Sequence, residues 1–286
     1  MSETWGIDQP PQGDPKPGWG GRLIATVRAI GIVAVIGTGL VLLLLLRQIE
    51  RPVFGLHRPW TPWITQTVCR ATLALMGLRL RIEGTPLRGP GAVVANHASW
   101  LDIFVLNAVQ RVYFVSKAEV KGWPGIGVLA RATGTIFIRR DRREAAAQAQ
   151  LLTERLGAGH RLLVFPEGTS SDARRVLPFK PALFASFLNA PVEGMQVQPV
   201  SVVYSPPKGR DPRFYGWWGD AAFGDSLLQV LAQWPQGQVT VVQHTPLMVA
   251  EFSDRKALAR QSEEAVRRAL EERGVAAPAE PSSPDN

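Results

Sequence analysis

An unbroken apolar run, from residue 29 to residue 46, dominates the first part of the chain. At about 1.5 Å of rise per residue, a helix over this run is about 27 Å long, close to the hydrocarbon thickness of a bilayer. Arg22 and Arg28 precede the run, and Arg47 and Arg51 follow it. No small-residue cleavage motif follows, so the pattern favours a retained membrane helix over a signal peptide. Basic residues at both ends leave its orientation open, and a hairpin with the next segment is also open.

The segment that follows, residues 59–76, is also mostly apolar and carries Trp60 and Trp63 near its start. Tryptophans at one end of an apolar helix are typical of a helix that lies in the membrane interface, with its rings at headgroup depth. A core helix of the globular domain would produce the same pattern. The sequence leaves both interpretations open.

The pattern changes at residue 78. Leu78, Leu80 and Ile82 alternate with charged residues, which predicts a half-buried strand. From there on, short continuous apolar runs alternate along the chain with helical stretches. This order is typical of a largely parallel sheet flanked by helices on both faces. The predicted buried strands are 91–95, 112–115, 135–138, 162–165, 197–204 and 239–243. The predicted helices are 99–109, 142–156, 181–188, 223–232 and 254–272. The fold class is therefore α/β.

Composition divides the 286 residues into four segments. Residues 1–21 are polar with several prolines and glycines, and residues 274–286 are rich in alanine, proline and serine, so both ends are predicted to be disordered. Residues 22–76 form a membrane-associated helical segment. Residues 77–273 are long enough for one α/β domain, which is where the function is expected to reside.

Basic residues outnumber acidic ones by 32 to 24, for a net charge of +8. This excess indicates an anionic partner, either nucleic acid or the acidic surface of a membrane. No recognisable nucleic-acid-binding motif occurs, so an anionic membrane is the predicted partner and nucleic acid is not. The single cysteine, Cys69, excludes an intrachain disulfide and is consistent with a reducing cytoplasm.

Several common catalytic signatures do not occur in the sequence. There is no G-x-S-x-G elbow, no G-x-x-x-x-G-K-[ST] loop and no H-E-x-x-H helix. The four histidines do not have metal-ligand spacing with one another. Hydrolase-elbow, nucleotide-hydrolysing and zinc-dependent enzymes are therefore disfavoured.

The predicted strand 91–95 runs directly into Asn96 and His97. In open α/β sheets, sites form beyond the carboxyl ends of strands. A histidine held by a carboxylate can take a proton from an attacking hydroxyl, and Asp102 is one tight turn away. Another interpretation is a capping box, with Ser99 as the N-cap of a helix and Asp102 as its acidic partner, beside a buried structural His97. Spacing alone does not decide between these.

A second polar segment follows the predicted strand 162–165 and reads Phe-Pro-Glu-Gly-Thr-Ser over residues 165–170. A carboxylate, a glycine that lets backbone approach a ligand and a hydroxyl suit a small polar acceptor group. A structural Pro/Gly turn without a role in binding would have the same residue pattern.

Four motifs in order resemble those of the PlsC-like glycerolipid acyltransferase family, which includes 1-acylglycerol-3-phosphate acyltransferases and lyso-ornithine lipid acyltransferases. The first, N-H-x-x-x-x-D, is matched by Asn96, His97 and Asp102, and the third, F-P-E-G-T-R, by residues 165–169. The second, G-x-x-F-I-x-R, is matched by Gly134, Phe137, Ile138 and Arg140. The fourth, a hydrophobic segment with proline, is matched by Val197, Pro199 and Val200.

The resemblance implies a glycerol-3-phosphate acyltransferase-like fold and an O-acyltransferase in which His97 is the general base and Asp102 orients it. It implies a lysolipid acceptor, an acyl carrier protein or CoA thioester as donor, and no metal or cofactor. It implies a place at the inner (cytoplasmic) membrane, with the catalytic domain facing the cytoplasm. The residues it implies for substrate binding are Asn96, Lys117, Phe137, Arg140, Glu167, Gly168, Thr169 and Ser170. Among these, Arg140 would contact the anionic headgroup.

The chain departs from the family at Ser170, where the third motif usually has arginine. A serine hydroxyl cannot replace the planar, charged fork that an arginine offers a phosphate. Either Arg174 or Arg175 reaches back from the following loop, or the acceptor lacks a phosphomonoester. Lyso-ornithine lipid fits the second case, and 1-acyl-sn-glycerol-3-phosphate the first. A non-catalytic lipid-binding protein on the same fold is the alternative function, and an intact His97–Asp102 pair argues against it.

Overall fold

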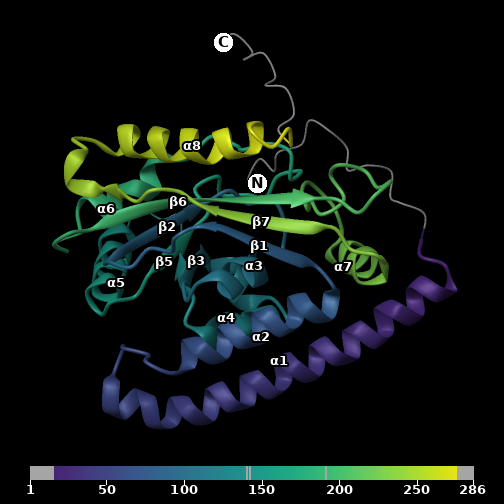
Figure 1. The fold of residues 1–286 in the computed structure, drawn as a ribbon. Helices are drawn as coiled ribbons and strands as arrows, with labels where there is room; N and C mark the ends of the chain where they lie inside the picture. The colour runs from purple at the N-terminus through teal and green to yellow at the C-terminus, as the bar shows by residue number, and fades with distance from the viewer. Residues whose placement is uncertain (1–15, 140, 142, 191, 276–286) are drawn as a thin grey trace.

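One mixed sheet forms the centre of the computed structural model, which describes residues 16–139, 141, 143–190 and 192–275 (Figure 1). In these residues the strand order is β1-β7-β6-β2-β5-β3-β4, with β8 paired to β6. Neighbouring strands are parallel except where β6 meets β7 and β8. The strands are β1 Arg79–Gly84, β2 Gly91–Ala95, β3 Tyr113–Lys117, β4 Ile136–Ile138, β5 Leu162–Val164, β6 Gln196–Ser205, β7 Gln238–Gln243 and β8 Leu247–Met248. The predicted α/β class with a largely parallel sheet is confirmed.

Helices cover both faces of this sheet, which is why its central strands lack polar alternation. Every residue of β2 is buried, and Ala92 and Val94 pack into one apolar cluster while Val93 and Ala95 pack into the other. Helices α1, α2, α3 and α7 contribute to the cluster that contains Val93 and Ala95. Helices α5, α6 and α8 contribute to the cluster that contains Ala92 and Val94. The helices are α1 Trp19–Phe54, α2 Thr61–Met76, α3 Asp102–Val109, α4 Ile126–Thr133, α5 Ala145–Gly157, α6 Ala185–Leu188, α7 Phe223–Ala232 and α8 Arg255–Glu271. Short 3-10 turns occupy Ala118–Gly122, Pro181–Phe184 and Val249–Glu251.

Helices α1 and α2 form a hairpin along one side of the domain (Figure 1). Helix α1 has 36 residues and is long and apolar enough to cross a membrane. Gly39 lets the two helices approach closely, since a β-carbon there would lie 2.3 Å from Val68 Cγ2. Near the start of α1, the Arg28 guanidinium donates to the Leu231 and Gln233 carbonyls at the end of α7, at 2.8 and 2.7 Å. Helices α1 and α2 therefore pack against each other, and the start of α1 is fixed to the domain.

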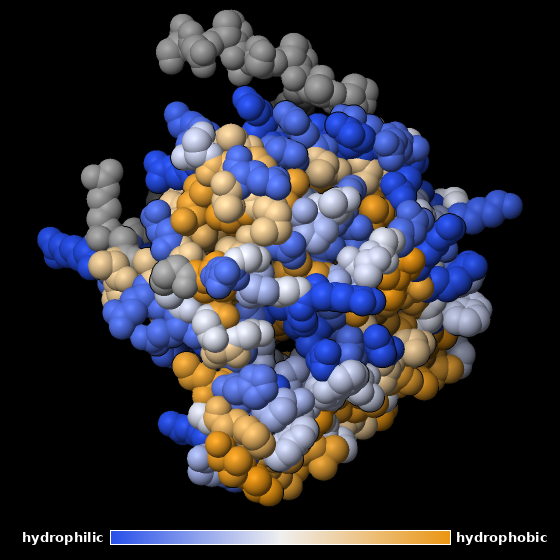
Figure 2. All heavy atoms as spheres, turned by 60° about the vertical axis from the view of Figure 1, so that its left-hand side comes forward, coloured by the Kyte–Doolittle hydropathy of each residue, from blue (hydrophilic) through white to orange (hydrophobic). Residues whose placement is uncertain are grey.

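Helix α2 has a side buried in the core of the domain and exposed tryptophans at its start. Cys69 and Leu73 are buried in the core of the domain. The rings of Trp60 and Trp63 at the start of the helix are 43% and 53% exposed. Figure 2 shows apolar surface along the lower edge of the molecule, where Figure 1 places this hairpin. Helix α2 therefore serves both the core and the apolar surface.

Two of the predicted helix starts are wrong, and helix α4, strand β8 and the 3-10 turns Ala118–Gly122 and Val249–Glu251 escaped prediction. The helix expected from residue 99 begins at Asp102, because the Ser99 hydroxyl accepts the Leu101 N–H and holds a turn there. The helix expected from residue 142 begins at Ala145. Helix α4 and strand β8 are too short, at eight and two residues, to show a period in the sequence.

Candidate active site

The loop between β2 and α3 carries His97 beyond the carboxyl end of β2. Asn96 begins this loop, and its side chain is tied to the neighbouring strand β6. Its Nδ2 donates to the Val202 carbonyl at 2.9 Å, and its Oδ1 accepts the Val202 N–H at 2.8 Å. Asn96 is 1% exposed. It was predicted to bind substrate, but the structure uses it to fix the backbone from which His97 projects.

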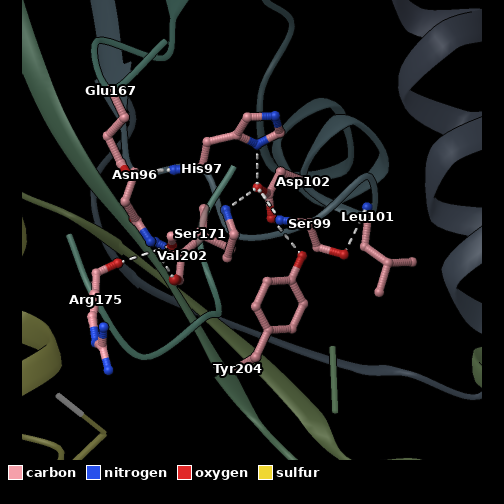
Figure 3. Close-up of polar contacts among 11 residues, drawn as sticks. Asn96, His97, Ser99, Leu101, Asp102, Glu167, Ser171, Arg175, Val202 and Tyr204 are labelled. Atoms are coloured by element: carbon pink, nitrogen blue, oxygen red, sulfur yellow. Dashed lines mark hydrogen bonds and ion pairs between the residues drawn. The ribbon is translucent and has the colours of Figure 1, made fainter. Parts of the chain in front are cut away.

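His97 and Asp102 form a close pair (Figure 3). His97 Nδ1 lies 2.8 Å from Asp102 Oδ2, and the two side chains are 20% and 0% exposed. A carboxylate only accepts hydrogen bonds, so Nδ1 carries the proton and Nε2 carries the free lone pair. Nε2 points away from the carboxylate in Figure 3. This is the tautomer that a general base requires.

The capping interpretation of Asp102 is half correct. Asp102 Oδ2 accepts the backbone N–H groups of Ala98 and Ser99 at 2.8 and 3.0 Å, as an acidic capping partner does. Ser99 is not the N-cap, because that position belongs to Leu101. One carboxylate oxygen therefore binds both the turn and His97.

Glu167 braces the same loop from the other side. Its Oε1 accepts the His97 N–H at 2.9 Å, and its Oε2 accepts the Leu177 N–H at 3.1 Å. Burial raises the pKa of Glu167 well above its usual range, although these two N–H donors act in the opposite direction. Glu167 is 2% exposed. It was predicted to contact substrate, whereas here both of its oxygens are occupied by backbone donors.

The segment that follows Glu167 also contacts the histidine loop. Gly168 has φ +72°, a left-handed conformation that favours glycine, and its N–H closes a turn on the Phe165 carbonyl at 3.1 Å. The Ser171 N–H then donates to the His97 carbonyl at 2.8 Å. Thr169 and Ser170, both half-buried, lie between these two points. Thr169 and Ser170 therefore belong to the segment whose backbone contacts the His97 loop at Ser171.

Lys117 and the second-motif residues lie farther along the sheet. Lys117 ends β3 and is exposed, and Phe137 is in the adjacent edge strand β4. Strands β5 and β3 separate β4 from β2. Because these strands are parallel, their carboxyl ends share the edge of the sheet that holds His97. Arg140 lies outside the described residues.

Two residues at the site were missed by the sequence-based prediction. The Phe165 ring stacks on the His97 imidazole with centroids 4.1 Å apart and planes 13° apart. The Tyr204 hydroxyl donates to Asp102 Oδ1 at 2.7 Å. Tyr204 lies two residues after Val202 in β6, so it is on the same face of the sheet.

Comparisons with known proteins agree with this geometry. The family model described as Acyltransferase matches residues 79–203. The lyso-ornithine lipid O-acyltransferase of Rhodobacter capsulatus is 54% identical over 94% of this chain and 98% of its own. The Brucella abortus enzyme of the same name is 36% identical over 87% and 96%.

Among solved structures, the 1-acyl-sn-glycerophosphate acyltransferase PlsC of Thermotoga maritima superposes with a TM-score of 0.64. It is 25% identical, over 92% of this chain and 97% of that one. The His97–Asp102 pair beyond β2 is consistent with acyltransferase chemistry. The relatives matched over nearly their full length and the shared fold indicate the same family. The chain belongs to the PlsC-like family of lysolipid acyltransferases.

Proposed function

We propose that this enzyme esterifies the free hydroxyl of lyso-ornithine lipid with a fatty acyl group from an acyl carrier protein or CoA thioester, without a metal or cofactor. The observation that carries the chemistry is the 2.8 Å contact between His97 Nδ1 and Asp102 Oδ2, which leaves Nε2 free on a partly exposed side chain. A base with this geometry suits attack by a hydroxyl on a thioester carbonyl.

The reaction follows from this arrangement. His97 Nε2 takes the proton of the acceptor hydroxyl while the hydroxyl oxygen bonds to the thioester carbonyl carbon. Asp102 stabilises the imidazolium that forms. When the tetrahedral intermediate collapses, the carbon–sulfur bond breaks and the leaving thiolate takes the proton from His97. An ester and a free thiol result, and His97 returns to its starting state.

The acceptor is inferred from the charges around Ser170. The two arginines that could replace the family's arginine each direct their Nε toward another group of the protein. Arg174 Nε donates to the Val275 carbonyl, and Arg175 Nε lies 3.7 Å from Asp172 Oδ2. The Arg175 side chain points away from His97 in Figure 3. This arrangement favours an acceptor without a phosphomonoester, in agreement with the names of the two relatives above.

Ser170→Arg tests the acceptor assignment. We expect the new guanidinium to raise the ratio of kcat/KM for 1-acyl-sn-glycerol-3-phosphate over lyso-ornithine lipid by about tenfold, because a charge-assisted pair with a phosphate is worth roughly 1.5–3 kcal/mol. Paired assays of the purified enzyme with both acceptors measure the ratio. Ser170→Gln, similar in polarity but uncharged, is the control. An unchanged ratio in Ser170→Arg would contradict a role for position 170 in headgroup choice.

We further place the enzyme at the inner (cytoplasmic) membrane, with the catalytic domain facing the cytoplasm and an anionic lipid surface as its partner. The α1–α2 hairpin supports this, since Val27, Ile30 and Val33 are each more than 60% exposed on α1. So many exposed apolar side chains on one element are costly in water and suit a membrane.

A cysteine on α8 tests this orientation. Lys256 is exposed, so Lys256→Cys should react with a membrane-impermeant maleimide in inside-out vesicles and remain unlabelled in spheroplasts. Wild-type enzyme is the control, because burial raises the pKa of its Cys69 thiol to about 12 and keeps it unreactive. Labelling of Lys256→Cys in intact spheroplasts would place the catalytic domain on the opposite side.

A further inference from the structure

The Tyr204 hydroxyl occupies the one oxygen of Asp102 that His97 does not use. It lies 2.7 Å from Asp102 Oδ1, and the whole Tyr204 side chain is 1% exposed on the inner face of β6 (Figure 3). We propose that Tyr204 is a positioning residue, which completes a chain from His97 through Asp102 and sets the pH range in which His97 accepts a proton. The inference rests on the proposed base role of His97.

The hydrogen bonds to Asp102 are divided unevenly between its two oxygens. Oδ2 accepts from His97 Nδ1, from the Ala98 N–H and from the Ser99 N–H. Among the described contacts, Oδ1 has Tyr204 alone. Without that hydroxyl, a fully buried carboxylate oxygen would lack a partner, which is costly. The carboxylate would also lose the contact that fixes its rotation, and the direction of His97 depends on that rotation.

The environment of Tyr204 keeps its hydroxyl a donor. Burial, followed by the negative charge of Asp102, raises the pKa of Tyr204 well above its usual range. The phenol therefore stays protonated, and its hydroxyl donates a hydrogen bond to the Asp102 carboxylate. The titratable groups around this pair are His97 on the loop, Glu167 behind the His97 backbone and Tyr215, whose ring is 5.4 Å from that of Tyr204.

The electrostatic consequence has a definite sign. A donor on Oδ1 draws negative charge away from the His97 side of the carboxylate, so Asp102 attracts an imidazolium less strongly. The carboxylate therefore favours transfer of a proton to His97 less with the Tyr204 hydroxyl in place than without it. Removal of the hydroxyl should have the opposite effect and move the acidic limb of the activity profile toward higher pH.

Tyr204→Phe and Tyr215→Phe form a matched pair of variants. Both tyrosines are 1% exposed and adjacent, but the Tyr215 hydroxyl binds Gln236 Oε1 at 2.7 Å and the Gly237 N–H at 2.8 Å, with no contact to Asp102. We expect Tyr204→Phe to lower kcat about tenfold, with the KM values for acceptor and donor within about twofold. Its half-maximal pH for kcat/KM should rise. Tyr215→Phe should keep the wild-type profile.

Unfolding must be separated from positioning. Tyr215→Phe loses two hydrogen bonds and Tyr204→Phe loses one, so a general loss of stability would affect Tyr215→Phe at least as much. If Tyr204→Phe does not fold, 3,5-difluorotyrosine inserted at position 204 keeps the ring and makes the hydroxyl a stronger donor. The half-maximal pH should then fall below that of wild type.

The outcomes distinguish this inference from the proposed function. With His97→Ala assayed in parallel, an inactive His97→Ala beside a wild-type kcat and pH profile in Tyr204→Phe overturns only the role of Tyr204. The same profile change in Tyr215→Phe as in Tyr204→Phe also overturns it. Wild-type activity in His97→Ala overturns the base role itself, and the role of Tyr204 with it.

Discussion

Replacement of His97 by alanine is expected to lower kcat for acyl transfer about 100- to 10,000-fold, because the variant has no group to accept the hydroxyl proton. The side chain is 20% exposed, and without it Asp102 Oδ2 keeps the Ala98 and Ser99 N–H donors. We therefore expect the unfolding temperature and the membrane-bound fraction to stay close to wild type. Single-turnover assays with purified enzyme, an acyl thioester and lyso-ornithine lipid measure the change.

His244→Ala is a suitable control for this experiment. His244 also makes a hydrogen bond from its ring to a side chain, since its Nε2 lies 2.8 Å from Ser201 Oγ. Ser201 faces α8, where its hydroxyl donates to the Val266 carbonyl, so this pair is on the opposite face of the sheet from Asp102. Retained activity in His97→Ala with the same protein amount would contradict the base role.

Most strands and helices of the fold could be predicted from the sequence, because each has a local pattern of apolar and polar residues. Strand β2 is buried on both faces and reads as a continuous apolar run, and α7 was predicted with its observed bounds. The start of α3 was missed because the Ser99 turn depends on a contact between Ser99 and Leu101 that competes with the helix. The α1–α2 hairpin depends on close packing at Gly39, which no single helix reveals.

In the active site, too, contacts between residues near in sequence could be predicted and contacts between distant residues could not. His97 and Asp102 are five residues apart, so their meeting across one turn was foreseeable. Glu167 is 70 residues from His97, and Tyr204 is 102 residues from Asp102. Contacts of that separation depend on which strands become neighbours and on their register, and neither follows from composition or period. For this reason Glu167 was expected to bind substrate, and Tyr204 was not singled out.

Replacement of Glu167 by alanine is expected to destabilise the enzyme by about 2–6 kcal/mol, since the part-buried N–H groups of His97 and Leu177 would each lose their acceptor at about 1–3 kcal/mol apiece. Activity should fall as well, because the His97 backbone loses its brace. Denaturant unfolding in detergent measures the change. Glu264→Ala is the control, since that carboxylate is 60% exposed and pairs with Arg260 at only 3.9 Å. Equal stability of Glu167→Ala and Glu264→Ala would contradict the bracing role.

Glu167→Gln separates the shape of this side chain from its charge. The amide keeps one acceptor oxygen and turns an NH₂ group toward the other backbone N–H, so at low pH we expect it to be less stable than wild type by about 1–3 kcal/mol. In the wild-type enzyme, burial raises the pKa of Glu167, so the folded state binds the carboxyl proton more tightly than the unfolded state does. The stability that this carboxyl contributes is full below its unfolded pKa and declines as pH rises toward its folded pKa. The deficit of Glu167→Gln should therefore shrink as pH rises above about 4.5, where a free glutamate is about half ionised. A deficit that widens over that range would show that the two N–H donors outweigh burial and that Glu167 braces His97 as an anion.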